Sequence, residues 1–374
     1  MIKLLIAGDF CPQNRVTELF DEENYESVLG EVVDYTKKAD YSIVNLEAPI
    51  VETNVRPIIK CGPNLKCTSK AIKALKFAGF NMVTLANNHF YDYGDDGVCQ
   101  TLTACKYEGL DVVGGGMNID EATNILYKDI KGTKFAFINC CEHEFSIATE
   151  TSAGSNPLNP IQQYYAIQEA KNNADKIIVI IHGGHEHYQL PSPRMQQIYR
   201  FFIDIGADVV INHHQHCFSG YEFYNGKPIV YGLGNFCFDW NVRNRLWNEG
   251  YMLQLDFHEN EILIELIPYI QCRDIAAIKF ISNKDKFNQE INILNRIISD
   301  EKNLKHEVDK YYSSIHLEIK SIFQLWDGRF FRKLYKIGLL PNTFSLKKIL
   351  KIRNLTECES HRDKLLHFLK NYKS

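Results

Sequence analysis

Polar residues that can bind a cation or transfer a proton recur directly after short apolar runs of the chain. The first three runs end in Asp9, in Glu47 and in the pair Asn88-His89. Two further runs end in histidine-rich segments, residues 182–187 and 212–216. Carboxylate, amide and imidazole groups together form a mixed oxygen and nitrogen ligand set. Such a set suits Mn, Fe or Zn better than a metal that prefers thiolates.

The apolar runs have the length and the Val- and Ile-rich composition of buried strands. They are residues 3–7, 41–46, 82–85, 135–139, 177–181, 209–211 and 229–231. Apolar residues at helical spacing lie between them, at 27–38, 69–78, 97–108 and 195–205. This alternation predicts an α/β sheet core covered by helices, and residues 253–256 and 262–267 read as closing antiparallel strands. Because sites in open α/β sheets form outside the carboxyl ends of the strands, we expect the five polar segments to converge.

Each polar residue taken alone has an ordinary structural explanation. An aspartate at the end of a strand is more often a helix N-cap, and a single buried histidine is more often structural than a ligand. Five polar segments at successive strand ends are harder to explain in that way. The sequence therefore predicts a metal site at the edge of the sheet.

The order of the motifs resembles the CapA family of bacterial capsule and poly-gamma-glutamate synthesis proteins, which is related to the calcineurin-like metallophosphoesterases. The resemblance covers about residues 1 to 245 and leaves out the C-terminal part of the chain. The motifs that carry it are residues 8–9, 45–49, 86–94, 182–186, 206–216 and 231–236. It implies an α/β fold, a four-layer α/β/β/α metallophosphatase-like sandwich, with a two-metal centre at the sheet edge.

The resemblance also implies roles for individual residues. Two divalent metal ions (Mn, Fe or Zn) would be held by Asp9, Glu47, Asn88, His182, His214 and His216. In this scheme Glu47 bridges the two metals, and His214 and His216 face one metal each.

The remaining roles concern the reaction and the substrate. His89 matches a general acid, and Asp92 either orients its imidazole or is a turn residue before Tyr93. Glu186 and Asn235 are expected near the mouth of the pocket as substrate-binding residues, although a structural role for Glu186 is nearly as plausible. These assignments follow from the resemblance together with the spacing of the motifs.

The chain departs from the phosphoesterase pattern at two ligand positions. The first motif of the phosphoesterases is Asp-x-His, whereas this chain has Asp9, Phe10 and Cys11. Cys11 either ligates a metal as a thiolate or packs as a small apolar residue. Where the phosphoesterases usually have a bridging aspartate, this chain has Glu47, whose longer side chain reaches farther toward the metals.

Charge divides the chain into two parts. Residues 284–374 carry 19 Lys and Arg against 11 Asp and Glu, a net charge of +8, whereas residues 1–283 carry 23 against 35, a net charge of −12. We expect a CapA-like metallophosphoesterase-type domain at residues 1–270 and a basic helical extension at 284–374. The extension is a candidate for binding a membrane surface or a polyanion, and no specific nucleic-acid motif accompanies it.

Composition excludes several classes of protein. No apolar run approaches the roughly 20 residues that span a bilayer, and the 11 cysteines form no CxxC pair. Together with the absence of a signal-like N-terminus, this favours a cytoplasmic location, with membrane association through the extension as a further possibility.

Two functions fit the predicted site. The first is a metal-dependent hydrolase of the phosphoesterase type that acts on a phosphoester or an anionic polymer precursor in capsule, polysaccharide or poly-gamma-glutamate biosynthesis. The alternative is a non-catalytic, metal-containing scaffold or binding protein in capsular polymer synthesis. Loss of the first-motif histidine favours the alternative, and the presence of His89 favours the hydrolase.

Overall fold

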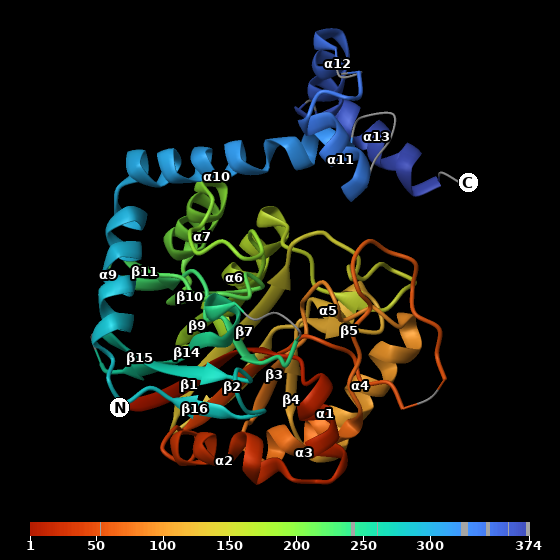
Figure 1. The fold of residues 1–374 in the computed structure, drawn as a ribbon. Coiled ribbons are helices and arrows are strands. Elements are labelled where there is room, and N and C mark those ends of the chain that lie inside the picture. Colours follow the sequence, from red (N-terminus) through yellow and green to blue (C-terminus); the bar gives the residue numbers. More distant parts are fainter. Residues whose placement is uncertain are drawn as a thin grey trace. The chain divides into compact units, whose positions relative to one another are not determined.

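The computed structural model describes residues 1–374 except 53, 241–243, 260, 323–327, 342–344, 358 and 372–374. The chain forms two compact units, Met1–Leu304 and Lys305–Ser374. Figure 1 shows the first unit as sheets enclosed by helices, and the second as helices alone.

The first large sheet has the strand order β16-β15-β14-β1-β2-β3-β4, with β13 paired to β1. Its strands are β1 (Ile2–Phe10), β2 (Tyr41–Leu46), β3 (Met82–Thr84), β4 (Asp111–Val113), β13 (Asn235–Cys237), β14 (Glu249–Phe257), β15 (Ile262–Gln271) and β16 (Ile278–Phe280). Strands β1 to β4 are parallel, and β14 to β16 continue the sheet in antiparallel pairing. The predicted closing strands are therefore confirmed.

The second large sheet has the order β11-β12-β10-β9-β7-β6. Its strands are β6 (Leu126–Ile130), β7 (Thr133–Cys141), β9 (Lys176–His182), β10 (Val209–His213), β11 (Tyr221–Tyr224) and β12 (Lys227–Val230). The four inner strands are parallel, and each edge strand pairs in antiparallel fashion. A small pair, β5 (Gly115–Gly116) and β8 (Gly154–Ser155), lies apart from both sheets.

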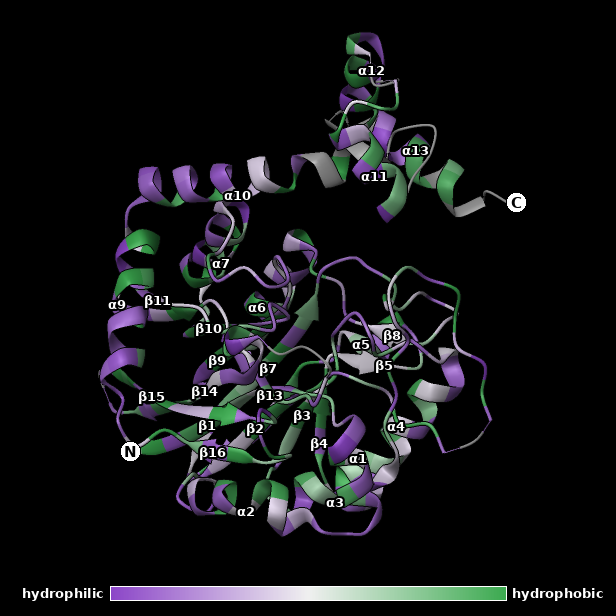
Figure 2. Ribbon diagram, in the orientation of Figure 1, coloured by the Kyte–Doolittle hydropathy of each residue, from purple (hydrophilic) through white to green (hydrophobic). Residues whose placement is uncertain are grey.

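The two sheets pack face to face through aromatic side chains. The ring centroids of Tyr41 and Phe137 lie 5.7 Å apart, and those of Phe135 and Phe257 lie 5.1 Å apart. Each pair joins a strand of the first sheet to β7 of the second, and these are favourable distances for aromatic contact. Figure 2 shows hydrophobic residues along the inner strands, where both faces are covered.

Helices cover the outer face of each sheet. Those on the side of the first sheet are α1 (Asn14–Asp21), α2 (Tyr25–Thr36), α3 (Ser69–Phe77) and α4 (Gly94–Glu108). Those on the second sheet are α6 (Pro160–Asn173) and α7 (Pro193–Ile205). Two single-turn helices, α5 (Ile119–Ala122) and α8 (Arg245–Asn248), lie in connections. The layers run helix, sheet, sheet, helix, so the predicted four-layer sandwich is confirmed.

The boundary between the units lies later in the chain than the sequence indicated. Helix α9 (Asp285–Ser299) packs on the sandwich, because the ring of Phe287 lies 5.3 Å from that of Phe218 and 5.7 Å from that of Tyr251. The division falls after Leu304, inside α10 (Glu301–Ile322). The residues from 284 to this point carry balanced charge, so they contribute nothing to the basic excess.

The described part of the second unit also contains the helices α11 (Arg329–Lys336), α12 (Leu346–Glu357) and α13 (Glu359–Asn371). Residues 305–374 carry 15 Lys and Arg against 7 Asp and Glu, a net charge of +8. Among the described residues, no helix combines the length and the apolar character needed to cross a membrane. The helical extension is therefore present, and it holds the whole basic excess of the chain.

Candidate metal centre

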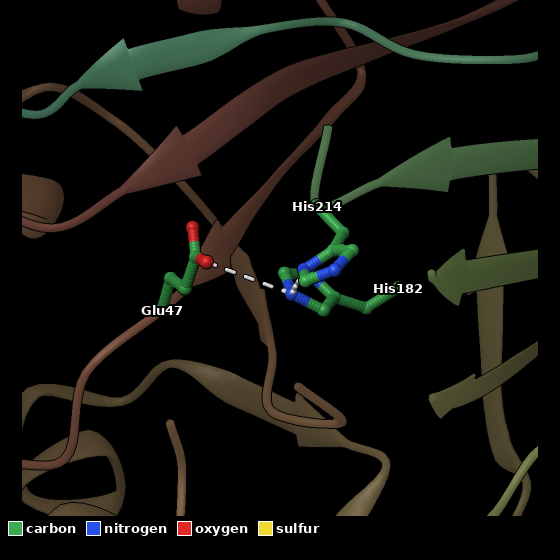
Figure 3. Close-up of side chains that lie close together, drawn as sticks. All are labelled: Glu47, His182 and His214. Carbon is green, nitrogen blue, oxygen red and sulfur yellow. Dashed lines mark hydrogen bonds and ion pairs between the residues drawn. The ribbon is translucent and has the colours of Figure 1, made fainter. Parts of the chain in front are cut away.

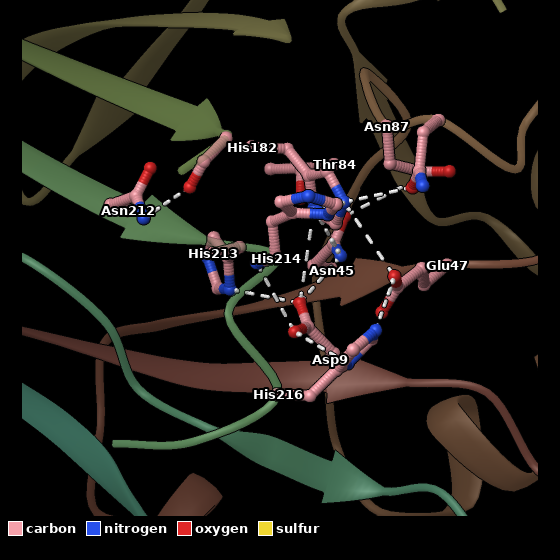
Figure 4. Close-up of polar contacts among 12 residues, drawn as sticks. Asp9, Asn45, Glu47, Thr84, Asn87, His182, Asn212, His213, His214 and His216 are labelled. Carbon is pink, nitrogen blue, oxygen red and sulfur yellow. Dashed lines mark hydrogen bonds and ion pairs between the residues drawn. The ribbon is translucent and has the colours of Figure 1, made fainter. Parts of the chain in front are cut away.

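The carboxyl ends of five parallel strands bring the predicted ligands to one place (Figure 4). Asp9 lies near the end of β1, and Glu47 directly follows β2. From the second sheet, His182 is the last residue of β9 and His214 directly follows β10. Asn88 follows β3 in the loop beyond Thr84. The edges of two stacked sheets therefore meet at a single buried cluster.

One group of ligand atoms consists of Glu47, His182 and His214, whose candidate donor atoms all lie within 4.8 Å of one another. The Nε2 atom of His182 lies 3.0 Å from Nδ1 of His214 and 3.5 Å from Oε1 of Glu47 (Figure 3). The side-chain oxygen of Asn88 lies 3.1 Å from the same Nε2 atom. A ring nitrogen and two oxygens thus lie within 3.5 Å of His182 Nε2, close enough for the four atoms to serve together as ligands.

A second group consists of Asp9, Glu47 and His216, again with candidate donor atoms within 4.8 Å. His216 Nε2 lies 3.7 Å from Glu47 Oε1, and its Nδ1 lies 3.8 Å from Asp9 Oδ2. Glu47 belongs to both groups. The carboxylate of Glu47 therefore lies within reach of the candidate donor atoms of both groups.

Glu47 provides the test of whether these residues fit a metal. The side chain is completely buried, and within the described residues neither carboxylate oxygen has a hydrogen-bond partner. Burial, and then the negative charge of Asp9, raise the pKa of Glu47 well above its usual value. A buried carboxyl group without partners is costly unless something neutralises it. Divalent cations would do so, and the residues therefore fit them.

The histidines of the cluster are suited to bind metal at neutral pH. Burial lowers the pKa of His216 to about 4, although the charge of Asp9 opposes this shift. Burial, and then the charge of His214, lower the pKa of His182 well below its usual value. Both rings are therefore neutral near pH 7, which is the form of imidazole that coordinates a cation.

Asp9 is held as a carboxylate by its neighbours. Burial would raise its pKa, but the close approach and positive charge of His213, with smaller effects of His182 and His216, bring the pKa below its usual value. Asn45 Nδ2 donates to Asp9 Oδ1 at 2.8 Å, and His213 Nδ1 lies 3.3 Å from the same oxygen. The motifs did not assign His213 a role. The only sequence signal for a role of His213 was its position at the end of β10.

The backbone of the loop after β10 is bent so that both flanking histidines face the cluster. His214 has φ = 95° and His216 has φ = 54°, in the region that residues other than glycine seldom adopt. The side chain of Gln215, which lies between the two histidines in the sequence, is placed elsewhere, and its Nε2 donates to Tyr188 O. Such local strain persists where surrounding structure enforces it, commonly at functional sites.

The predicted acid and its partner are in direct contact. His89 Nδ1 lies 2.7 Å from Asp92 Oδ2, and the Asp92 side chain is fully buried. Asp92 thus has the geometry of the orienting residue, one of the two readings of its motif. A third residue, Lys60, forms an ion pair with Asp92 Oδ1, and its side chain is 1% exposed. The sequence had no signal for Lys60, which lies in the irregular segment between β2 and α3.

The two expected substrate-binding residues differ in position. Glu186 is half-exposed, and the ring of its neighbour His187 lies 6.0 Å from that of His216. Asn235 is fully buried instead of lying at a pocket mouth. Its Oδ1 lies 2.9 Å from His216 Nδ1, and its Nδ2 donates to Trp247 O at 3.2 Å. Because its amide is used within the protein, Asn235 is placed to orient His216.

Cys11 belongs to neither ligand group of the described residues. It is completely buried, and burial followed by the neighbouring Cys67 raises its pKa well above the usual value, which favours the neutral thiol. Gln13 Nε2 lies 3.5 Å from its sulfur. The packing alternative for Cys11 is therefore the one that the contacts support.

The architecture and the ligand cluster together define a class of protein. Two stacked sheets with outer helices, carrying carboxylate, amide and imidazole groups at their common edge, form an α/β sandwich with a candidate metal site. The profile of the bacterial capsule synthesis protein family PGA_cap matches residues 3–240, more than half of the sequence, and the chain belongs to this family.

Individual relatives agree with this membership. The capsule biosynthesis protein CapA of Bacillus anthracis is 33% identical over 246 residues, which cover 64% of this chain and 60% of the relative. The PGA biosynthesis protein CapA of Bacillus subtilis (strain 168) is 32% identical over 238 residues, 62% of each chain. The match thus spans about six-tenths of these relatives. A phosphatase structure from Mycoplasma pneumoniae aligns with a TM-score of 0.44 and 16% identity over 77% of this chain and 98% of its own.

Proposed function

We propose that the first unit is a metal-dependent hydrolase of the phosphoesterase type that acts in the synthesis of a capsular polymer. Its substrate would be a phosphoester or an anionic polymer precursor, and its cofactor two divalent cations such as Mn, Fe or Zn. The observation that carries the proposal is the membership of buried, unpartnered Glu47 in both ligand groups. Family membership supports the biological setting.

Each side chain has a defined task in such a reaction. Asp9, Glu47, Asn88 and the three histidines at positions 182, 214 and 216 would hold the cations, which polarise a phosphoryl group and activate water. Asp92 accepts a hydrogen bond from Nδ1–H of His89, so in the doubly protonated ring the second proton is on Nε2, which would give it to the leaving oxygen. Glu186, half-exposed beside the centre, would contact the substrate.

Metal analysis and an ester panel test this proposal together. Purified protein should contain up to two equivalents of a divalent metal and hydrolyse phosphomonoesters or phosphodiesters. His89→Ala should retain the metal and lose about 100-fold or more of kcat, within the usual range for a general acid. Metal-loaded protein that hydrolyses no ester, with His89→Ala indistinguishable from wild type, would instead favour the non-catalytic scaffold.

We further propose that the second unit binds an anionic surface, either a membrane or a polyanion. Its net charge of +8 coincides with exposed apolar side chains on its helices. These include Phe330, Leu346, Leu350 and Leu366. Basic and apolar side chains together are what amphipathic helices use at the surface of an anionic membrane.

A further inference from the structure

A buried lysine lies against the pair formed by His89 and Asp92. Lys60 Nζ forms an ion pair with Asp92 Oδ1 and lies 3.2 Å from His89 Nδ1. The side chain of Lys60 is 1% exposed and that of Asp92 is fully buried. Burying two charges is costly unless both are well paired, and the proposed reaction makes no use of Lys60. The question is what this lysine contributes to the site.

The distances identify which atom carries the shared proton. Asp92 Oδ2 lies 2.7 Å from His89 Nδ1, and an ionised carboxylate only accepts hydrogen bonds. Two unprotonated atoms would repel at this distance, so Nδ1 carries a proton and donates it to Oδ2. An ammonium group only donates, so it cannot bind a protonated Nδ1. Lys60 and His89 therefore hold opposite oxygens of one carboxylate.

The segment that carries Lys60 encloses Asp92 from other sides as well. Leu65 N donates to Asp92 Oδ2 at 2.7 Å, and Ile58 N donates to the backbone oxygen of Asp92 at 2.9 Å. Lys60 Nζ also lies 5.3 Å from the centroid of the Phe145 ring, a favourable distance for a cation and an aromatic face. The carboxylate is thus fixed at both oxygens. Without the ammonium, only one oxygen would remain held.

We propose that Lys60 is a positioning residue, which fixes the Asp92 carboxylate so that Nδ1–H of His89 stays bonded to Oδ2 and the doubly protonated ring presents Nε2–H to the reacting oxygen. The kinetic consequence rests on the proposed hydrolase function. The hydrogen bond itself exists with or without turnover, so it can be measured independently.

Nitrogen-15 NMR of labelled histidines tests the hydrogen bond directly. In the wild-type protein, His89 should be in the Nδ1–H tautomer with a downfield, slowly exchanging proton, assigned by its absence from the His89→Gln spectrum. Lys60→Met keeps the apolar stem and removes the charge, and it should give a mixture of tautomers and loss of that proton. Lys60→Arg should retain the wild-type signals, as should Lys66→Met, which alters an exposed lysine of the same segment. An unchanged His89 spectrum in Lys60→Met would overturn the proposal.

A second comparison covers the case in which Lys60→Met does not fold because Asp92 is left unpaired. Asp92→Asn and the double variant Lys60→Met/Asp92→Asn both avoid a buried, unpaired carboxylate. If Lys60 acts only through Asp92, the His89 spectra of these two proteins should be the same. A further change caused by Lys60→Met in the Asp92→Asn background would show a different role and overturn the proposal.

Kinetics separate the positioning role from the proposed function. A proton donor matters most when the leaving group is poor, so Lys60→Met should lose about 10-fold or more of kcat on phenyl phosphate but about 3-fold or less on 4-nitrophenyl phosphate. KM and metal content should not change. Equal losses on both esters would overturn the positioning role. A wild-type protein without esterase activity whose Nδ1–H signal is lost in Lys60→Met would overturn the hydrolase and support the role of Lys60.

Discussion

Glu47 belongs to both ligand groups, so among single side chains its charge should have the largest effect on metal content. Glu47→Gln preserves size and burial but removes the negative charge that two cations would share. We expect the metal content to fall from two equivalents to one or fewer, measured by elemental analysis after gel filtration. Glu186→Gln, which alters a half-exposed carboxylate nearby, should keep the wild-type content. Full occupancy in Glu47→Gln would contradict the bridging position.

His216 should make the metal-free protein less stable in acid. Its pKa is lowered from 6.5 to about 4 in the folded state, so the unfolded chain takes up the proton first as the pH falls. Stability from this residue is present above about pH 6.5 and is lost as the pH falls to about 4, a difference of about 3 kcal/mol. Glu47, with a raised pKa, acts in the opposite direction.

Unfolding free energies measured in EDTA between pH 7 and pH 4 test this effect. His216→Gln should lose about 3 kcal/mol less than wild type over that range, whatever its stability at pH 7. His258→Gln, a change at a partly exposed histidine outside the cluster, is the control and should follow the wild-type curve. Parallel curves for wild type and His216→Gln would show that His216 is not held neutral by burial.

At the scale of elements, the contact between β1 and Gly234, which directly precedes β13, sets the position of Asp9. A Cβ on Gly8 would lie 1.9 Å from the backbone oxygen of Gly234, and Asp9 N donates to that same oxygen at 3.2 Å. Gly8→Ala must therefore move β13 and Asn235 with it. We expect a loss of about 3 kcal/mol in unfolding free energy, at the upper end for overpacking, together with weaker metal binding.

The matched control is Gly30→Ala in α2. The added Cβ there meets only the flexible end of Glu26, and alanine is the better helix former. This variant should be neutral or stabilised by up to about 1 kcal/mol in the same denaturant titration. Equal effects of the two substitutions would mean that the approach of β1 to Gly234 does not constrain the site.

The same elements show how much of the fold and of the site could be predicted from the sequence. Strand ends are marked by apolar runs, so the convergence of Asp9, Glu47 and His182 followed from the rule for α/β sheets. Contacts between segments distant in sequence leave no such periodic signal. Lys60 lies in an irregular segment, and Asn235 was expected near the mouth of the pocket, although β13 inserts it beside β1. The sequence did not predict helix α6, because its apolar stripe is weak. Helix α9 was expected to belong to the extension, because a helical pattern does not reveal which surface the helix packs against.

At the scale of the whole molecule, charge is divided between the two units. Residues 1–304 carry 27 Lys and Arg against 39 Asp and Glu, a net charge of −12, and residues 305–374 carry +8. The acidic unit holds a site that needs cations, so part of its negative balance would be neutralised on metal binding. The basic unit holds none of the ligands in the two groups. The two units therefore suit different partners, which makes them separable by experiment.

Binding to vesicles tests the role of the basic unit. The full-length protein should bind vesicles that contain phosphatidylserine, more weakly as salt is raised, and should not bind neutral phosphatidylcholine vesicles. Replacing Lys333, Lys336 and Lys347 by Glu in the full chain should weaken binding about 100-fold or more, since each basic residue contributes about 1 kcal/mol near such a surface.

Two further measurements separate charge from other effects and membranes from other polyanions. Replacing three lysines of the sandwich, Lys37, Lys38 and Lys106, by Glu makes the same change in net charge outside the basic unit and should leave vesicle binding within about 3-fold of wild type, because salt screens charges that do not contact the vesicle. Phe330→Ser and Leu346→Ser remove exposed apolar side chains from the basic unit and should weaken binding to vesicles but not to a soluble polyanion such as heparin. If the serine variants bind vesicles and heparin as well as the wild-type protein does, the basic unit binds by charge alone. Its partner is then a polyanion, not a membrane.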